Sequence, residues 1–334
     1  MKQQTDRARS WGTRGPVRPG GWRWSLGFGA LVAVASCTSV GREPRPTTAA
    51  SGAPAARVNA NEAPAGTLDA RIDVGGLGLH LHCEGSGAPT VVFESGLGRD
   101  GSEWFASAAA AGSATARATR ACAYDRAGRG QSDPPVTRPH SNRQMARELF
   151  RLLDEAGEQG PFVLVGHSMG GTNARLFLEE HSDSVAGMVL VDATPEPPPL
   201  DRVTPEMRAE FERGIAAMEG LDVPTLLAAF DELAASKASL GDKPLVILAA
   251  GRLPHEALAE GVPDEARAAA EAELRARLAA QQRLTTLSTN CAFVVAENAG
   301  HDIPNESPAL LARGVAAVVE SVRAGTRLEA NALR

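Results

Sequence analysis

A serine lies in the sequence Gly166-His-Ser-Met-Gly-Gly171, directly after the apolar run 162–165 and directly before an amphipathic run. Glycines around a serine at a strand-to-helix junction permit a sharp turn, which lifts the hydroxyl above the strand end and points the next backbone N–H at the same place. The G-x-S-x-G pattern therefore predicts that Ser168 is an exposed nucleophile. A serine that only caps a helix is the structural alternative.

A serine hydroxyl needs a base, and the base needs a group that orients it. His301 follows the last predicted strand and precedes the final predicted helix, which is the chain order expected when G-x-S-x-G carries the nucleophile. A solvated surface histidine is the alternative. His80 and His82 share one face of an early strand, but no third ligand stands at metal-binding spacing, so we expect an exposed edge there and no metal.

The elements around these residues predict an α/β fold. Eight apolar runs bounded by turn residues predict strands, and the first two form a hairpin around Gly75 and Gly76. The runs are residues 71–74, 79–83, 89–93, 120–124, 162–165, 187–191, 245–248 and 292–295. Helical patterns at 141–156, 172–181 and 308–323 lie between or after strands. Alternating strands and helices predict a mostly parallel eight-stranded sheet with helices on both faces.

Two long charged segments with helical patterns interrupt this alternation. We interpret residues 195–243 as a helical cap over the carboxyl edge of the sheet, and residues 254–290 as a helical insertion beside it.

From about residue 68 to 325 the chain resembles the α/β-hydrolase fold family, with five landmarks in the family's order. They are Glu94-Ser-Gly-Leu-Gly98, Tyr124–Ser132, Gly166–Gly171, Leu190-Val-Asp192 and Gly300-His301. The resemblance implies that the backbone N–H groups of Leu97 and Met169 form an oxyanion hole. It implies a structural role for residues 125–132.

The acid that orients His301 departs from the family's usual pattern, because no Asp follows the seventh strand and the first acid there is Glu256. Asp192 ends the sixth strand, where some haloalkane dehalogenases of this fold place their acid. We favour Asp192 and keep Glu256 as the alternative. The resemblance then implies ester hydrolysis through an acyl-enzyme, because dehalogenases and epoxide hydrolases of this fold attack with Asp where this chain has Ser168.

Two other functions stay open. A proline iminopeptidase-like aminopeptidase would use the same groups, with Glu206, Glu210 and Glu212 of the cap holding an amine. An inactive hydrolase fold acting as a binding lipoprotein is the other. We expect a small-molecule ester substrate and no metal or organic cofactor. The spacing of the apolar residues in the cap is more typical of packing within the cap than of an acyl pocket.

The N-terminal segment predicts export. Residues 1–36 carry six Lys and Arg side chains against one acid and end in an uncharged stretch, 25–36, too short to span a membrane but suited to a signal peptide. Val34-Ala-Ser-Cys37 resembles a lipobox, so we favour lipidation of Cys37 and membrane attachment over ordinary cleavage and secretion. Residues 37–66 predict a flexible linker, 67–325 the catalytic domain and 326–334 a tail.

The remaining cysteines, Cys83, Cys122 and Cys291, leave two interpretations. The family's strand order puts Cys83 beside Cys122, where a disulfide is possible after export. Three buried thiols are the other interpretation, which we favour.

Composition and charge favour a globular domain and disfavour nucleic acid as a partner. The chain has 334 residues, 43% of them apolar and 22% charged, which is typical of a globular domain. A net charge of −6 and the lack of a basic patch in the body of the chain disfavour nucleic acid as a partner.

Overall fold

The computed structural model describes residues 35–36, 66–195, 204–329 and 333. The predicted leader and linker therefore lie almost wholly outside the described residues, as do Cys37 and residues 196–203 of the predicted cap. Within the described part of the chain, no helix is both long and apolar enough to cross a membrane.

One sheet of nine strands organises the molecule, in the order β1-β9-β8-β7-β6-β4-β5-β3-β2. The strands are β1 (Ala35–Ser36), β2 (Leu68–Asp73), β3 (Gly78–Glu84), β4 (Val91–Glu94), β5 (Ala121–Tyr124), β6 (Phe162–His167), β7 (Val185–Val191), β8 (Leu245–Ala250) and β9 (Cys291–Ala296). The pairs from β5 through β9 are parallel, whereas β2, β3 and β1 pair antiparallel at the edges. The predicted eight-stranded, mostly parallel sheet is confirmed as β2–β9.

Strand β1 is an addition that the sequence did not indicate. Ala35 and Ser36 belong to the predicted leader, yet they pair with Phe293 and Ala292 at the edge of β9. Cleavage before Cys37 would remove this strand and leave β9 as the edge of the sheet.

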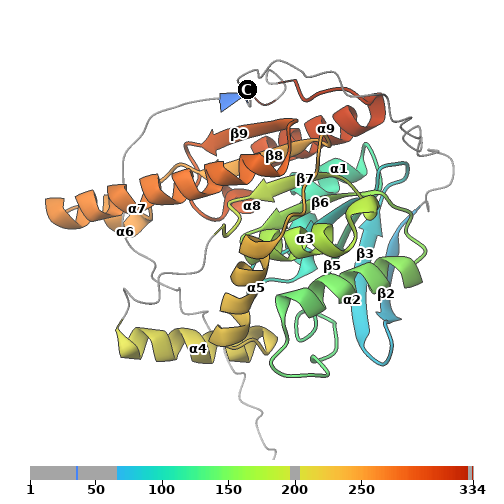
Figure 1. The fold of residues 1–334 in the computed structure, drawn as a ribbon, viewed down its shortest axis with the longest axis horizontal. Helices are drawn as coiled ribbons and strands as arrows, with labels where there is room; N and C mark the ends of the chain where they lie inside the picture. The colour runs from blue at the N-terminus through green and yellow to red at the C-terminus, as the bar shows by residue number, and fades with distance from the viewer. Residues whose placement is uncertain (1–34, 37–65, 196–203, 330–332, 334) are drawn as a thin grey trace, which may run out of the picture.

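Helices cover both faces of the sheet (Figure 1). On one face, α2 (Asn142–Glu155) and α3 (Met169–Glu180) pack on a core that includes Leu149, Phe177 and Leu190. On the other, α1 (Ala111–Ala116) and α9 (Pro308–Ala324) pack on residues such as Val189 and Leu248. Because both faces are covered, every residue of β6, β7 and β8 is buried, as their apolar sequences predict.

The two excursions are helical. The cap contains α4 (Pro205–Glu219) and α5 (Val223–Ala235), and the second excursion contains α6 (His255–Leu258) and α7 (Asp264–Arg283), which packs against β8. Figure 1 shows α4 beyond the layers that flank the sheet. The remaining short elements are η1 (Gly101–Phe105), η2 (Ser182–Ser184), η4 (Leu284–Leu287) and α8 (Ile303–Glu306).

Candidate active site

Ser168 occupies a strained turn between β6 and α3, with φ of 54° and ψ of −122°. The residues two positions before and after Ser168 must be glycines, because a Cβ on Gly166 would lie 2.6 Å from the Gly170 carbonyl oxygen and one on Gly170 would lie 2.3 Å from that of Glu94. A non-glycine residue with positive φ is held there only by its surroundings, and such strain is concentrated at functional sites. The local sequence thus sets the serine hydroxyl at the end of β6.

The structure brings Ser168, His301 and Asp192 into one hydrogen-bonded line. His301 Nε2 lies 3.0 Å from Ser168 Oγ, and Nδ1 lies 2.6 Å from Asp192 Oδ2. Strands β6 and β7 are parallel neighbours, so the residues that follow them meet at the same edge of the sheet. Glu256, the alternative acid, lies in α6, and its side chain is outside what the structure describes.

Asp192 is buried, and four donors surround its carboxylate. Oδ1 accepts from the Ala250 N–H at 2.9 Å and from Gln281 at 2.7 Å, and Oδ2 accepts from Arg277 at 2.9 Å as well as from His301. Burial by itself would raise the pKa of Asp192, but the Arg277 charge and the His301 hydrogen bond outweigh it and hold that pKa below its ordinary value. Asp192 is therefore ionised at neutral pH.

Arg277 and Gln281 were not identified from the sequence. They lie four residues apart on α7, a spacing that puts both side chains on one helix face, but no motif surrounds them.

A second histidine supports the loop that carries His301. His167 precedes Ser168, is 3% exposed, and donates from Nε2 to the His301 carbonyl oxygen at 2.8 Å. Burial, with the nearby His301, lowers the pKa of His167 to about 4, so its ring is neutral at physiological pH.

The two predicted oxyanion residues lie beside the serine. Met169 is the first residue of α3, so its N–H has no acceptor inside the helix. A Cβ built on Gly96 would lie 3.3 Å from Ser168 Cβ, which shows that the peptide linking Gly96 to Leu97 passes close to Ser168. The side chains of Leu97 and Met169 pack with cap residues Ile215, Leu221, Leu226 and Phe230.

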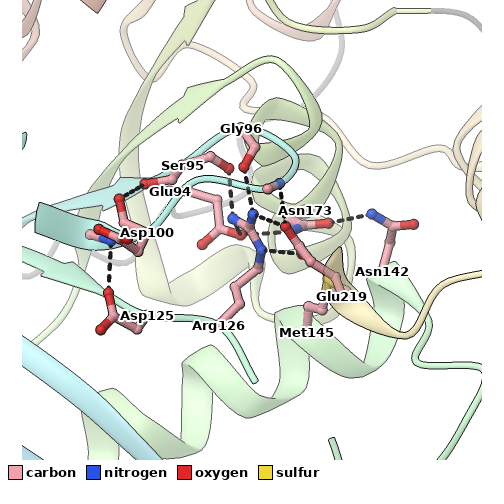
Figure 2. A network of polar contacts seen from close by, with 12 residues as sticks. Glu94, Ser95, Gly96, Asp100, Asp125, Arg126, Asn142, Met145, Asn173 and Glu219 are labelled. Carbon is pink, nitrogen blue, oxygen red and sulfur yellow. Dashed lines mark hydrogen bonds and ion pairs between the residues drawn. The ribbon is translucent and has the colours of Figure 1, made fainter. Parts of the chain in front are cut away.

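A buried polar network holds the loop of residues 95–100, which contains Leu97 (Figure 2). The Arg126 guanidinium donates to the carbonyl oxygens of Ser95 and Gly96, both at 2.6 Å, and to the carboxylate of Glu219 in α4. Arg126 lies inside residues 125–132, for which the resemblance implies a structural role, and the sequence of α4 has no feature that singles out Glu219.

The histidine pair of β3 has carboxylate partners. His80 hydrogen-bonds Asp125 at 3.1 Å and Asp69 at 2.7 Å, and His82 hydrogen-bonds Glu84 at 3.1 Å. The His80 side chain is 12% exposed, so the expectation of an exposed edge is wrong at this position, because the loop that begins at Asp125 lies against it. Among the described residues, the one cluster of potential metal ligands is Cys83, Cys122 and Glu158.

Cys83 and Cys122 form a disulfide, and Cys291 is not a free thiol either, so the interpretation of three buried thiols that we favoured is wrong. Cys83 and Cys122 face each other in the antiparallel pair of β3 and β5, with their Cα atoms 4.0 Å apart. The bond removes both thiols as metal ligands.

The three cap acids that an amine clamp would use lie on an exposed helix face. Glu206, Glu210 and Glu212 are all exposed on α4, and Glu212 pairs with Arg208 one turn away at 3.0 Å. This arrangement is typical of a solvated helix face.

Comparisons with known proteins agree with this architecture. The family description "alpha/beta hydrolase fold" matches residues 89–218. The protein YqjL of Bacillus subtilis is 26% identical over 237 residues, which are 70% of this chain and 85% of that protein. The chain spans only 11–25% of three other curated relatives that it matches.

Solved structures match the fold at low sequence identity. The epoxide hydrolase CorEH has a TM-score of 0.52 at 18% identity, over 75% of this chain and 96% of that one. A thermophilic esterase from Thermogutta terrifontis has a TM-score of 0.50 at 19% identity, over 78% of this chain and 100% of that one. The chain therefore has the α/β-hydrolase fold, and its residues 89–218 match the family of that name.

Proposed function

We propose that the protein is a serine hydrolase that cleaves carboxylic esters through an acyl-enzyme. The observation that carries the proposal is the line from Ser168 Oγ through His301 to the ionised Asp192, at 3.0 and 2.6 Å. In this line His301 Nδ1–H donates to Asp192, which leaves Nε2 free to accept the serine proton. The Asp nucleophile of dehalogenases and epoxide hydrolases is replaced here by Ser168, which favours acyl transfer.

The proposed reaction has two halves. Ser168 Oγ attacks the ester carbonyl while His301 Nε2 takes its proton, and the oxyanion accepts hydrogen bonds from the N–H groups of Leu97 and Met169. As the carbonyl re-forms, the C–O bond to the alcohol breaks and His301 protonates the leaving oxygen. Water then attacks the acyl-enzyme with His301 again as base, which releases the acid and restores Ser168. These steps need no metal or organic cofactor.

The cap favours an apolar acyl group. The side chains of both oxyanion residues pack with buried aliphatic and aromatic residues of α4 and α5, so an acyl chain bound beside Ser168 would meet apolar surface. The exposed cap acids do not support the aminopeptidase alternative.

The experiment is hydrolysis of p-nitrophenyl esters of increasing acyl length beside aminoacyl-naphthylamides, by wild type, Ser168→Ala and Ser182→Ala, which changes a serine in η2 away from the site. We expect ester turnover by wild type and S182A, and a loss of about 10⁴-fold or more in S168A. Activity on the naphthylamides alone would assign an aminopeptidase. A folded wild type that does not react with a fluorophosphonate probe would favour the inactive binding lipoprotein.

We also propose that the protein is exported and attached to a membrane by lipid on Cys37. Support comes from the basic, then uncharged, N-terminal sequence and from the Cys83–Cys122 disulfide, since disulfides persist in oxidising compartments.

A further inference from the structure

We propose that Arg126 and Glu219 are positioning residues that aim the Leu97 N–H at the oxyanion and link the oxyanion hole to the cap. This inference rests on the proposed function for the identity of the oxyanion. It goes beyond that function because it assigns a role in catalysis to two buried residues that do not touch the substrate.

The geometry of one peptide plane links Arg126 to the Leu97 N–H. The Gly96 carbonyl and the Leu97 N–H belong to the same peptide unit, which is planar, so fixing the oxygen fixes the direction of the N–H. Arg126 Nη2 holds that oxygen at 2.6 Å, and Nη1 holds the preceding carbonyl, of Ser95, at 2.6 Å. A cation bonded to the carbonyl also polarises the amide, which makes its N–H a stronger donor.

Glu219 attaches this guanidinium to the cap. Glu219, the last residue of α4, accepts from Arg126 Nε at 2.7 Å and from Nη2 at 2.6 Å. Its Oε1 also accepts the Gly98 N–H at 2.7 Å, so it holds the same loop one residue beyond Leu97. The position of α4 is thereby coupled to the position of the predicted oxyanion donor.

The buried Arg126 side chain carries a positive charge. Burial alone would lower the pKa of Arg126, but the carboxylates of Glu219 and then Glu94 outweigh it and raise that pKa above its ordinary value. Arg126 therefore keeps its charge in a buried site, and a buried charge of this kind must be fully partnered. Figure 2 shows that its N–H groups point toward the loop and toward Glu219, in agreement with the hydrogen bonds to Ser95 and Glu219.

The network also reaches α3, the helix that carries the second proposed oxyanion donor. Glu94 Oε1 lies 3.4 Å from Arg126 Nη1 and accepts from Asn173 Nδ2 at 2.6 Å. Asn173 lies on α3, the helix that begins at Met169. The segments that carry both proposed donors are therefore held by one set of hydrogen bonds.

The chain contains a matched control pair. Arg120 and Glu158 also form a buried bidentate pair, with side-chain exposures of 2% and 0%, the same as for Arg126 and Glu219. Arg120 likewise bonds carbonyl oxygens, those of Gly66 and Gly85. The hydrogen-bond partners of Arg120 among the described residues lie outside the loop of residues 95–100, so this pair reports the cost of disturbing a buried ion pair without disturbing the oxyanion loop.

The experiment compares Arg126→Lys and Glu219→Gln with Arg120→Lys and Glu158→Gln in the full chain, at a temperature where circular dichroism shows all four folded. Lysine keeps the charge but lacks the planar fork. We expect R126K to lower kcat for a p-nitrophenyl ester by about 10- to 100-fold and E219Q by about 3- to 10-fold, with KM within about 3-fold, because an oxyanion donor acts mainly in the transition state. We expect the controls to keep kcat within about 2-fold.

Two further readouts separate positioning from general damage. The inhibition constant of a trifluoromethyl ketone, which forms an oxyanion with the serine, is expected to rise by the factor by which kcat/KM falls. Amide hydrogen exchange measured by mass spectrometry is expected to quicken at residues 95–100 in R126K and E219Q and to stay at the wild-type rate there in the controls.

Equal kcat losses in R126K and R120K would overturn the inference, as would an unchanged inhibition constant. The exchange measurement needs no substrate. If wild type hydrolyses no ester, the proposed function fails by itself. In that case, an amide exchange rate at residues 95–100 of R126K equal to that of wild type overturns the positioning role separately.

Discussion

Arg277 donates a hydrogen bond to Asp192 Oδ2, the same oxygen that accepts from His301. Arg277 is 85 residues further along the chain and belongs to α7, in the second helical excursion. The second excursion therefore supplies a positive charge to the acid of the proposed triad. It contributes directly to the site, whereas the sequence indicated only an insertion beside the cap.

Asp192→Asn tests which acid orients His301. The carboxamide presents an N–H to the imidazole and stabilises the wrong tautomer, so we expect kcat for a p-nitrophenyl ester to fall by about 10³- to 10⁴-fold. Glu256→Gln is the matched variant, for which we expect kcat within about 2-fold of wild type. The reverse pattern would assign the role to Glu256.

Arg277→Met tests the electrostatic support of Asp192. The folded-state pKa of Asp192 lies below its unfolded value, so the pairing stabilises the protein above the ordinary carboxyl pKa, and this stabilisation is lost as pH falls toward the folded pKa. We expect R277M to lower the free energy of unfolding by roughly 1 kcal/mol at pH 7, a small value because the Arg277 side chain is 40% exposed and solvent screens its charge. The deficit should shrink in acid, as followed by urea unfolding at several pH values. A deficit that does not change with pH, or one equal to that of Arg208→Met on the exposed face of α4, would contradict this account.

His167→Gln tests whether the neutral His167, which hydrogen-bonds the His301 carbonyl oxygen, makes stability depend on pH. The folded-state pKa of His167 is about 4 against an ordinary 6.5, so the unfolded chain binds the proton first and wild type loses stability as pH falls through this window. The loss amounts to at most about 3 kcal/mol between pH 6.5 and 4. We expect the stability of H167Q to fall less over that range, in chemical denaturation at each pH. Parallel pH profiles for the two proteins would show that His167 does not carry this pH dependence.

Cys83→Ala with Cys122→Ala tests the disulfide. Because the bond constrains the unfolded chain, we expect the double variant to lose about 3 kcal/mol of unfolding free energy. Wild type treated with reductant is the matched control and should approach the stability of the variant. Reaction of both thiols with a thiol reagent in unfolded, unreduced protein would show that the bond is absent.

Cys37→Ser tests attachment through lipid. We expect wild type made in a bacterial host to fractionate with membranes, to need detergent for extraction and to carry labelled palmitate, since stable anchoring requires acyl chains. The C37S protein should be unlabelled and leave the membrane fraction. Unlabelled wild type in the soluble fraction would favour ordinary cleavage.

Local signals made the fold predictable. Strands such as β6 and β8 are buried on both faces and so have continuous apolar sequences, and the glycines around Ser168 mark a turn that other residues cannot make. Chain order then placed His301 after the last strand. Both features depend on residues close together in the sequence, or on the order of elements.

The supports of the site were not predictable, because they depend on distant contacts. Arg126 and Glu219 are 93 residues apart, and Gln281 is 89 residues from Asp192. A charged residue in a helix is ordinarily solvated, so nothing in the sequence separates Glu219 from the exposed acids of α4. The disulfide was open for a similar reason, since it depends on the register of β3 against β5.

Ser168 and Asp192 are the two described non-glycine residues with positive φ, and they follow adjacent strands. Each such residue costs about 1–3 kcal/mol of folding free energy. The rest of the domain must supply that energy, so variants selected only for thermal stability are expected to relax these two turns first. Stability and turnover therefore oppose each other in this chain at two identifiable backbone positions.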